Sequence, residues 1–357
     1  MEKLRVTMQR VQPVDREVMA QTQARLDSLT KPPGSLGVLE DIARQVAGIT
    51  RQVRPQLLKK CSVLMAADHG VVAEGVSAFP REVTPQMVLN FARGGAAMNV
   101  LARHVGAELV LVDIGVAADL PDMPGLLKKK VAYGTANMAQ GPAMTGEQAV
   151  RAVEVGIEIV EGLVSQGFGL IGTGEMGIGN TTPSTAIVAA FSGLPVEEVV
   201  GRGTGVDDAR LRSKIQAIER ALEVNRPDPG DPLDVLSKVG GLEIAGLAGV
   251  MLGAAANQVP VMVDGFISGA AALVATRLSP AVKDYLIGSH LSEEPGHKVM
   301  LESIGIKPML HMHMRLGEGT GAALAMTLVD AAIKILNEMA TFADAGVSSA
   351  LDCGGME

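Results

Sequence analysis

The feature that most constrains this chain is a glycine-rich stretch at residues 168–182. It begins with the apolar run FGLI, continues through GTGEMGIGNTT, and leads into an alanine-rich segment after Ser184. A short apolar run is typical of a buried strand, glycines permit a tight turn, and alanine favours a helix. The stretch therefore predicts a strand, a glycine turn and a helix, in that order.

Two nucleotide-binding motifs overlap in this stretch. Gly172, Gly174 and Gly177 match G-x-G-x-x-G, and the acidic pair 197–198 follows about 20 residues later, where a dinucleotide fold places its ribose-binding acid. Residues 174–181 also approach a phosphate-binding loop, but Asn180 occupies the position of its lysine. A triphosphate site is thus disfavoured, whereas an NAD-dependent dehydrogenase remains an alternative.

Both motifs depend on the same physical feature, which suits a single phosphate. Glycines let backbone amides approach an anion, and the N-terminus of the following helix adds unpaired N–H groups and a positive dipole end. A plain strand-to-helix turn would explain isolated glycines equally well. Thr181 and Thr182, beside Asn180, add side-chain donors at this point, so we favour an anion site.

The rest of the chain predicts an α/β fold. Short, largely apolar runs alternate with helical segments, which indicates a parallel sheet covered on both faces. The runs lie at 62–66, 109–112, 169–171, 260–263, 285–287 and 308–310. We expect helices at 15–30, 39–51 and 320–339, and a shorter one after Thr341.

Polar or glycine residues follow each apolar run. Ligands bind beyond the carboxyl ends of strands in open parallel sheets, so we expect these residues to surround one site. They are Asp68, His69 and Gly70; Asp113 and Gly115; Gly174 and Glu175; Asp264 and Gly265; Ser289 and His290; and residues 315–319.

The composition of the 357-residue chain excludes several classes of protein. A net charge of −8 without a cluster of Lys and Arg argues against a nucleic-acid surface, and the lysines at 128–130 are typical of a solvated loop end. Two cysteines are too few for a disulfide framework. The N-terminus has no signal-peptide core, and the longest uncharged run, 244–263, is interrupted at Asn257, Gln258 and Pro260. We therefore expect a cytoplasmic protein without a membrane span.

Glu318 is the clearest candidate for chemistry. It stands between Gly317 and Gly319 after an apolar run, where desolvation would raise its pKa toward the range of a general base. An acid that caps the following helix is an equally good interpretation of the spacing.

Three other features have simpler interpretations. His69 is expected to hydrogen-bond its own loop, and residues 201–205 are expected to form a surface turn before a charged helix. His311 and His313 would need a further ligand to bind a metal, so we expect no metal site.

Several blocks of the sequence together resemble the nicotinate-nucleotide–dimethylbenzimidazole phosphoribosyltransferase family, which makes the lower-ligand nucleotide of cobalamin. They occur in family order over nearly the whole chain. The blocks are 31–37 (KPPGSLG), 67–70 (ADHG) with 74–80 (EGVSAFP), 174–182 (GEMGIGNTT), 201–205 (GRGTG), 289–292 (SHLS) with 294–297 (EPGH), and 315–321 (RLGEGTG).

The resemblance implies a fold and a reaction. It implies a Rossmann-like parallel-sheet domain at 56–325, a small helical domain formed by 1–55 together with 326–357, and a homodimer. It also implies transfer of phosphoribose from nicotinate mononucleotide to 5,6-dimethylbenzimidazole, giving α-ribazole 5′-phosphate and nicotinate, with inversion at the anomeric carbon and without a cofactor. A non-catalytic nucleotide-binding regulator is the alternative from another class.

The resemblance also implies roles for individual residues. Glu318 would be the base that accepts the benzimidazole proton, and Glu175 would support the ribose hydroxyls or the developing oxocarbenium charge. The residues implied to hold the phosphate are Gly177, Gly179, Asn180, Thr181 and Lys214. Those implied to line the aromatic-base pocket are Ser77, Phe79, Gln86, Met87 and Leu316.

Overall fold

The centre of the fold is a sheet in which every strand pair is parallel. The computed structural model describes residues 1–203 and 205–348, and within them the sheet has seven strands in the order β3-β2-β1-β4-β5-β6-β7. Their bounds are β1 Lys59–Ala67, β2 Glu108–Gly115, β3 Leu126–Lys128, β4 Phe168–Met176, β5 Val261–Val263, β6 Leu286–His290 and β7 Pro308–Leu310. The predicted α/β class and all six predicted strands are confirmed.

Strand β3 is the one that the sequence did not reveal. It has three residues, and Leu127 and Lys128 are exposed. A short, charged strand is typical of a sheet edge, where it blocks pairing with other chains. The interpretation of residues 128–130 as a loop end was therefore wrong at Lys128, which pairs with Asp113 of β2.

The strand order changes direction between β1 and β4. From β1 the sheet grows through β2 and β3 on one side, and through β4 to β7 on the other. The register pairs Ala66 with Met176, so the segments after β1 and β4 leave the sheet side by side. A crevice outside such a switch point is where open α/β sheets bind ligands.

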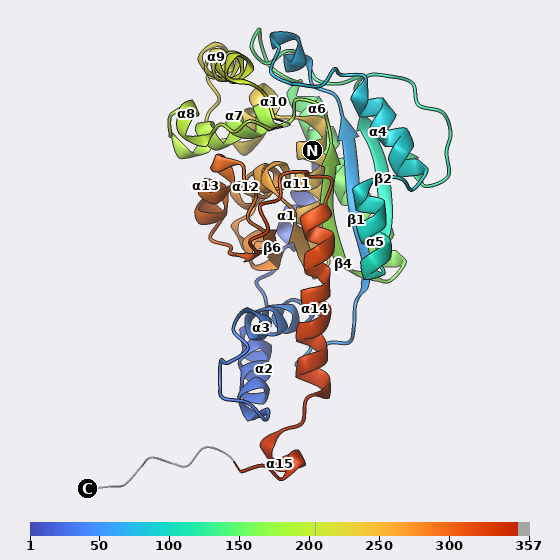
Figure 1. The fold of residues 1–357 in the computed structure, drawn as a ribbon, viewed down its shortest axis with the longest axis vertical. Helices are drawn as coiled ribbons and strands as arrows, with labels where there is room; N and C mark the ends of the chain where they lie inside the picture. Colours follow the sequence, from blue (N-terminus) through green and yellow to red (C-terminus); the bar gives the residue numbers. More distant parts are fainter. Residues whose placement is uncertain (204, 349–357) are drawn as a thin grey trace, which may run out of the picture. The chain divides into compact units, whose positions relative to one another are not determined.

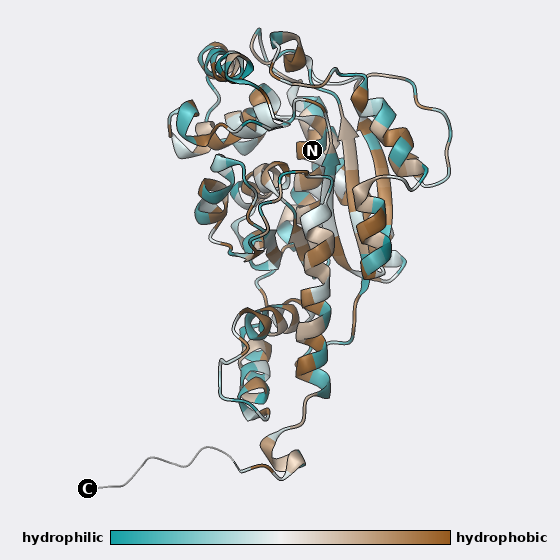
Figure 2. Ribbon diagram, viewed as in Figure 1, coloured by the Kyte–Doolittle hydropathy of each residue, from teal (hydrophilic) through white to brown (hydrophobic). Residues whose placement is uncertain are grey.

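Helices cover both faces of the sheet (Figure 1). One face packs against α6 (Gly146–Ser165), α11 (Leu242–Ala256) and α12 (Phe266–Leu278), and the other packs against α4 (Val83–Ala92) and α5 (Ala97–Val105). Helices α6 and α11 approach closely because Gly156 and Gly249 lack a side chain at their contact. A Cβ on either glycine would overlap the backbone of the other helix. Figure 2 shows hydrophobic residues along the strands that these helices bury.

The chain divides into two compact units. Unit 1 is Met1–Pro13 with Lys59–Met326, and unit 2 is Val14–Leu58 with Thr327–Glu357. The remaining helices of unit 1 are α1 Glu2–Arg10, α7 Thr181–Ser192, α8 Val196–Val199, α9 Asp208–Asn225, α10 Pro232–Val239 and α13 Pro295–Ile304. Helix α1 packs on α6 and α11, so residues 1–13 lie in the large unit and not in the small helical domain predicted for 1–55 with 326–357.

Unit 2 is helical. It contains α2 (Arg16–Ser28), α3 (Val38–Thr50), the later part of α14 (Thr320–Glu338) and α15 (Phe342–Ala345). Arg25 and Arg54 donate to the backbone at the end of α14. These helices match the predicted ones, and the tail beyond residue 348 lies outside the described residues. Helix α14 is long and apolar enough to cross a membrane by length and composition alone. However, 56% of its most apolar stretch is buried inside the protein, and core helices of soluble proteins have the same length and composition.

Candidate active site

A cavity of about 380 Å³ lies in unit 1 beyond the carboxyl ends of β4, β5 and β6. Loops that are far apart in the sequence enclose it: the segment leading into α4, the glycine turn after β4, the segments after β5 and β6, and the turn before α14. Residues Glu175, Gly177, Asn180, Thr181, Gly265, His290, Glu294 and Glu318 are among those that line it. Four of the six predicted strand ends, those of β4 to β7, thus contribute to one cavity.

Glu318 sits at the centre of an unusual turn. Its φ is 63°, and Gly317 and Gly319 on either side have φ of 80° and 92°. Three successive residues in the left-handed region explain the flanking glycines, and a glutamate there is strained. Strain of this kind persists where the surrounding structure enforces it, and it is concentrated at functional sites.

The cap of α14 is supplied by Asp264 and not by Glu318. The two oxygens of Asp264 accept hydrogen bonds from the backbone N–H groups of Gly319, at 3.1 Å, and Ala322, at 2.9 Å. The interpretation of Glu318 as a helix-capping acid is therefore wrong. Its carboxylate is left available for another role.

The Glu318 carboxyl is buried and incompletely paired. The residue is 8% exposed, and its Oε2 has no hydrogen-bond partner among the described residues. Burial raises the pKa of Glu318, a backbone hydrogen bond from Met98 opposes the rise, and the charge of Asp264 adds to it. A buried acceptor without a partner costs free energy, so a group that donates a proton to it would be bound favourably.

Glu175, the penultimate residue of β4, lies against this turn. Its Oε1 accepts from the backbone N–H of Glu318 at 3.3 Å, and its Oε2 accepts from the amide of Asn180. The pKa of Glu175 is raised to about 8: burial is the largest cause, the charges of Asp264 and Glu243 add to it, and the two hydrogen bonds partly oppose the rise. A side chain on Gly317 would overlap Glu175, so the carboxyl end of β4 and the turn at Glu318 are in direct contact.

The turn after β4 presents the N-terminus of α7 to the cavity. A Cβ on Gly177 would lie 2.5 Å from the carbonyl oxygen of Ala67, and Gly179 has a φ of 87°, so both positions require glycine. Behind the turn, the buried Nζ of Lys214 donates to Thr181 Oγ1 at 2.7 Å and to the carbonyl of Gly201 at 2.9 Å. Burial lowers the pKa of Lys214 to about 8, and the charge of Glu294 opposes this.

Comparison with known proteins assigns the chain to a family. A family model described as "Phosphoribosyltransferase" matches residues 11–347. The nicotinate-nucleotide–dimethylbenzimidazole phosphoribosyltransferase of Geobacter sulfurreducens is 61% identical over 341 residues, which cover 96% of this chain and 97% of the relative. That of Desulforamulus reducens is 60% identical over 343 residues, 96% of this chain and 98% of the relative. The chain belongs to this family.

Solved structures agree with this assignment. A crystal structure of CobT from Thermus thermophilus is similar with a TM-score of 0.90 at 52% identity, and the match covers 94% of this chain and 100% of that one. The resemblance seen in the sequence is thus confirmed, and the chain is a phosphoribosyltransferase. Its fold is that of the solved relative.

In this phosphoribosyltransferase most of the predicted site residues meet at the cavity. Eight of them line it: Phe79, Met87, Glu175, Gly177, Asn180, Thr181, Leu316 and Glu318. Lys214 and Gly179 lie just behind the lining. Ser77 and Gln86 are not among the lining residues: Ser77 Oγ accepts from the backbone N–H of Phe79 at 3.1 Å, and Gln86 is exposed on α4.

The structure corrects two interpretations of single motifs. Within the segment predicted as a surface turn at 201–205, the described residue Gly203 is buried: its backbone N–H donates to Glu294 Oε1 at 2.8 Å, and it lines the cavity. His69 does not bond its own loop. Its Nε2 lies 2.7 Å from Glu243 Oε1, on a helix 174 residues away in sequence.

The dinucleotide motif has a different explanation in the phosphoribosyltransferase. Gly172 and Gly174 lie inside β4 and not in the turn. A Cβ on Gly174 would lie 2.5 Å from the carbonyl oxygen of Glu318, and a Cβ on Gly172 would lie 2.7 Å from the Met326 side chain of α14. These glycines let α14 and the Glu318 turn pack on the strand, so their spacing does not indicate a dinucleotide site.

Sequence reasoning did not identify the buried charge of Glu243 beside the candidate site. Glu243 is fully buried and is the single charged residue of α11. The detectable signal was a carboxylate at the start of an otherwise apolar helix. Asp264 and His290 were expected at strand ends, and their side chains lie 3.8 Å apart beside the cavity.

Histidines 311 and 313 are exposed, and His313 Nδ1 pairs with Glu293 at 2.7 Å. Among the described residues, 1–203 and 205–348, no group of three or more His, Cys, Asp and Glu side chains is placed to hold a metal ion.

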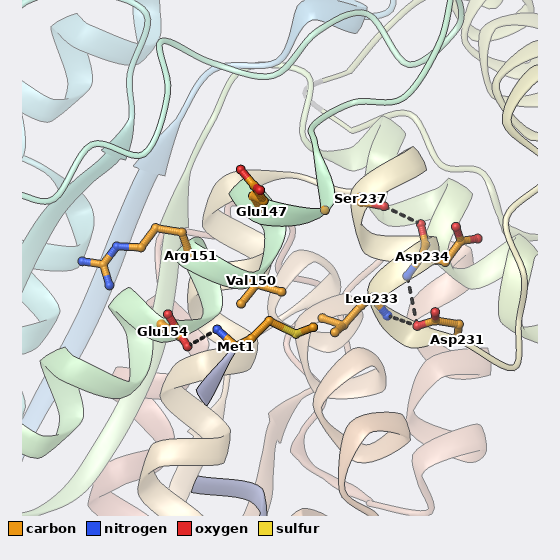
Figure 3. Close-up of a pocket in the computed structure, with 10 residues that line it drawn as sticks. Met1, Glu147, Val150, Arg151, Glu154, Asp231, Leu233, Asp234 and Ser237 are labelled. Atoms are coloured by element: carbon orange, nitrogen blue, oxygen red, sulfur yellow. Dashed lines mark hydrogen bonds and ion pairs between the residues drawn. The ribbon is translucent and has the colours of Figure 1, made fainter. Parts of the chain in front are cut away.

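A second cavity in unit 1, of about 450 Å³, is also rich in acids (Figure 3). Three of its four acids already have partners, and one of these is Asp234, which pairs with Lys238 at 2.8 Å. Asp231 caps α10 by accepting from the backbone N–H groups of Leu233 and Asp234, and Glu154 pairs with the N-terminal ammonium of Met1 at 2.6 Å (Figure 3). The strained turn at Glu318 and the glycine turn after β4 line the first cavity, which is therefore the candidate active site.

Proposed function

We propose that this phosphoribosyltransferase transfers the phosphoribosyl group of nicotinate mononucleotide to 5,6-dimethylbenzimidazole. The products are α-ribazole 5′-phosphate and nicotinate, and the reaction inverts the anomeric carbon during assembly of the cobalamin nucleotide loop. One observation carries the proposal: two buried carboxyls with raised pKa, Glu318 and Glu175, line a cavity together with a glycine turn and a helix N-terminus.

The chemistry asks for few groups. The bond between the anomeric carbon and the pyridinium nitrogen breaks, and its electron pair neutralises the positive charge of the departing ring. A benzimidazole nitrogen forms the new bond from the opposite face, and its second ring nitrogen releases a proton. The reaction therefore requires a base, a phosphate anchor and an apolar slot, but no general acid.

Glu318 has the properties of that base. Its Oε2 has no partner among the described residues, so it is available to accept the N–H proton. Its raised pKa brings the carboxylate closer to the working pH, which makes proton transfer more favourable than to an ordinary glutamate.

Glu175 is assigned to the ribosyl group. A pKa of about 8 means that its carboxyl is mostly protonated at neutral pH. A bound pyridinium or a developing oxocarbenium ion would favour the charged form, because an opposite charge lowers a carboxyl pKa. The carboxylate would then stabilise positive charge on the ribose.

The phosphate and the aromatic base occupy different ends of the cavity in this proposal. Backbone amides of the turn that contains Gly177 and Gly179 hold the phosphate with Asn180, Thr181 and Lys214. The apolar side chains of Phe79, Met87 and Leu316 flank the base, and Ser77 and Gln86 are proposed to join them when it binds. The exposed fractions of Phe79, 48%, and Leu316, 57%, are high for apolar side chains, which fits a rim that a flat ligand covers.

Three features outside the cavity are part of the proposal. They are a small helical domain formed by the segments 14–58 and 327–357, a homodimer, and a cytoplasmic location.

The direct test is to incubate the protein with nicotinate mononucleotide and dimethylbenzimidazole and to measure free nicotinate by chromatography. We expect nicotinate release that depends on both substrates. Binding of both substrates without release would favour a regulator, and a saturable, stoichiometric NAD(H) fluorescence change would favour a dehydrogenase. Either result would refute the proposed transfer.

A further inference from the structure

A buried ion pair lies beneath the glycine turn of the candidate active site. His69 follows β1, Glu243 begins α11, and their side chains are 1% and 0% exposed. Nε2 of His69 lies 2.7 Å from Oε1 of Glu243. Neither residue lines the cavity, and the proposed chemistry uses neither.

The imidazole ring is held between two glycines. A Cβ on Gly177 would lie 3.1 Å from His69 Nε2, and a Cβ on Gly241 would lie 2.6 Å from His69 Cε1. The ring therefore packs directly against the backbone of the turn that presents amides to the cavity. No side chain separates the ion pair from the proposed phosphate site at Gly177.

Fold stability alone does not explain this pair. Removing two charges from water is costly, and well-packed apolar residues in place of a buried ion pair are often as stable or more so. One atom of each partner, His69 Nδ1 and Glu243 Oε2, also has no hydrogen-bond partner among the described residues. An arrangement with this cost is expected where it holds a functional geometry.

The charges of the pair also matter to its neighbours. Burial lowers the pKa of His69, but the charge of Glu243 and its hydrogen bond outweigh burial, so the pKa is raised and the protonated ring is favoured. A protonated ring offsets the carboxylate charge of Glu243, which also acts on Glu175. Besides Glu243, the charge of Asp68 acts on the pKa of His69, and the charge of Asp264 acts on the pKa of Glu175.

We propose that His69 and Glu243 are positioning residues for the donor substrate: the ion pair fixes the imidazole against Gly177, and so holds the turn in the geometry that binds the 5′-phosphate. The inference rests on the proposed function, since the phosphate is that of nicotinate mononucleotide. It adds a supporting layer behind the groups that would contact the substrate.

The test compares the KM values of the two substrates in the full-length protein. Glu243→Gln keeps a hydrogen-bond acceptor for His69 but removes the charge, and His69→Gln keeps a donor for Glu243. We expect the KM for nicotinate mononucleotide to rise about ten-fold in each, because small displacements of binding groups weaken contacts strongly. The KM for dimethylbenzimidazole should change by less than about two-fold, since the base pocket does not contact the pair.

Asp113→Asn is the matched control. Asp113 is a buried carboxylate at the neighbouring strand end, it pairs with Lys130 at 3.1 Å, and it does not line the cavity. Breaking this pair should lower thermal stability and leave both KM values unchanged. The control separates loss of a buried charge from loss of positioning.

The outcomes are distinct. The inference is supported if, in either variant, the KM for nicotinate mononucleotide rises and that for dimethylbenzimidazole does not. Calorimetric titration with nicotinate mononucleotide alone, in which no turnover occurs, should show the same loss of affinity. Equal changes in both KM values, unchanged KM values with lower thermal stability, or failure of both variants to fold would show a merely structural pair. Absence of nicotinate release by the wild-type protein would instead refute the proposed function.

Discussion

Glu175 should destabilise the folded protein at neutral pH, and Glu175→Gln should relieve this. The carboxyl has a pKa of about 8 in the folded state against an ordinary value of 4.5. Between pH 4.5 and about pH 8 the folded state holds one more proton than the unfolded state. The free energy of unfolding therefore falls by about 1.4 kcal/mol for each unit by which the pH rises. The accumulated penalty at about pH 7 is on the order of 3 kcal/mol.

Glutamine retains the shape of this side chain and most of its contacts. Its amide oxygen can accept from the backbone N–H of Glu318, and a flipped Asn180 amide can accept from its NH₂ group. Imperfect hydrogen bonding would cost about 1 kcal/mol, so we expect a net gain of about 2 kcal/mol at pH 7. Near pH 4.5 the gain should vanish, because the wild-type carboxyl is then protonated in the folded state.

Urea unfolding followed by far-ultraviolet circular dichroism, at several pH values between about 4.5 and 8, measures this difference. Glu158→Gln is the matched control, because a hydrogen bond from Arg151 lowers the pKa of Glu158 despite partial burial, so its replacement should give no gain at neutral pH. The reasoning would be refuted if the difference in free energy of unfolding between Glu175→Gln and the wild type stayed constant with pH. It would also be refuted if this difference favoured the variant less at pH 7 than at pH 4.5.

The remaining predictions concern turnover. Glu318→Gln should abolish nicotinate release while calorimetry shows that both substrates still bind, and retained turnover would exclude Glu318 as the base. In the wild type, kcat should fall with decreasing pH through a value above 4.5, because the pKa of Glu318 is raised and the base must be deprotonated; a limb at or below 4.5 would contradict this. Lys214→Met should raise the KM for nicotinate mononucleotide at least about ten-fold and spare that for dimethylbenzimidazole. Gly317→Ala should lose activity, since the added methyl group would overlap Glu175 and strain a residue at φ 80°; wild-type kcat would show that the turn can relax.

Local features of the site are well determined by the sequence. Short apolar runs, glycines and polar strand ends specify strands, turns and the edge of the sheet where a ligand binds, because each depends on a few neighbouring residues. The turn around Glu318 and the turn after β4 were predictable for this reason. Strand β3 was not, since its short, charged sequence has the composition of a loop.

Only the tertiary structure decided which of these features touch. The sequence by itself determined the α/β class, the glycine turn and a carboxylate set between glycines. It did not show that Gly174 exists to admit the Glu318 turn, that Asp264 rather than Glu318 caps α14, or that His69 pairs with Glu243. Each of these depends on contacts between segments from 55 to 174 residues apart, and such contacts are set by the packing of whole helices and strands, which no local pattern encodes.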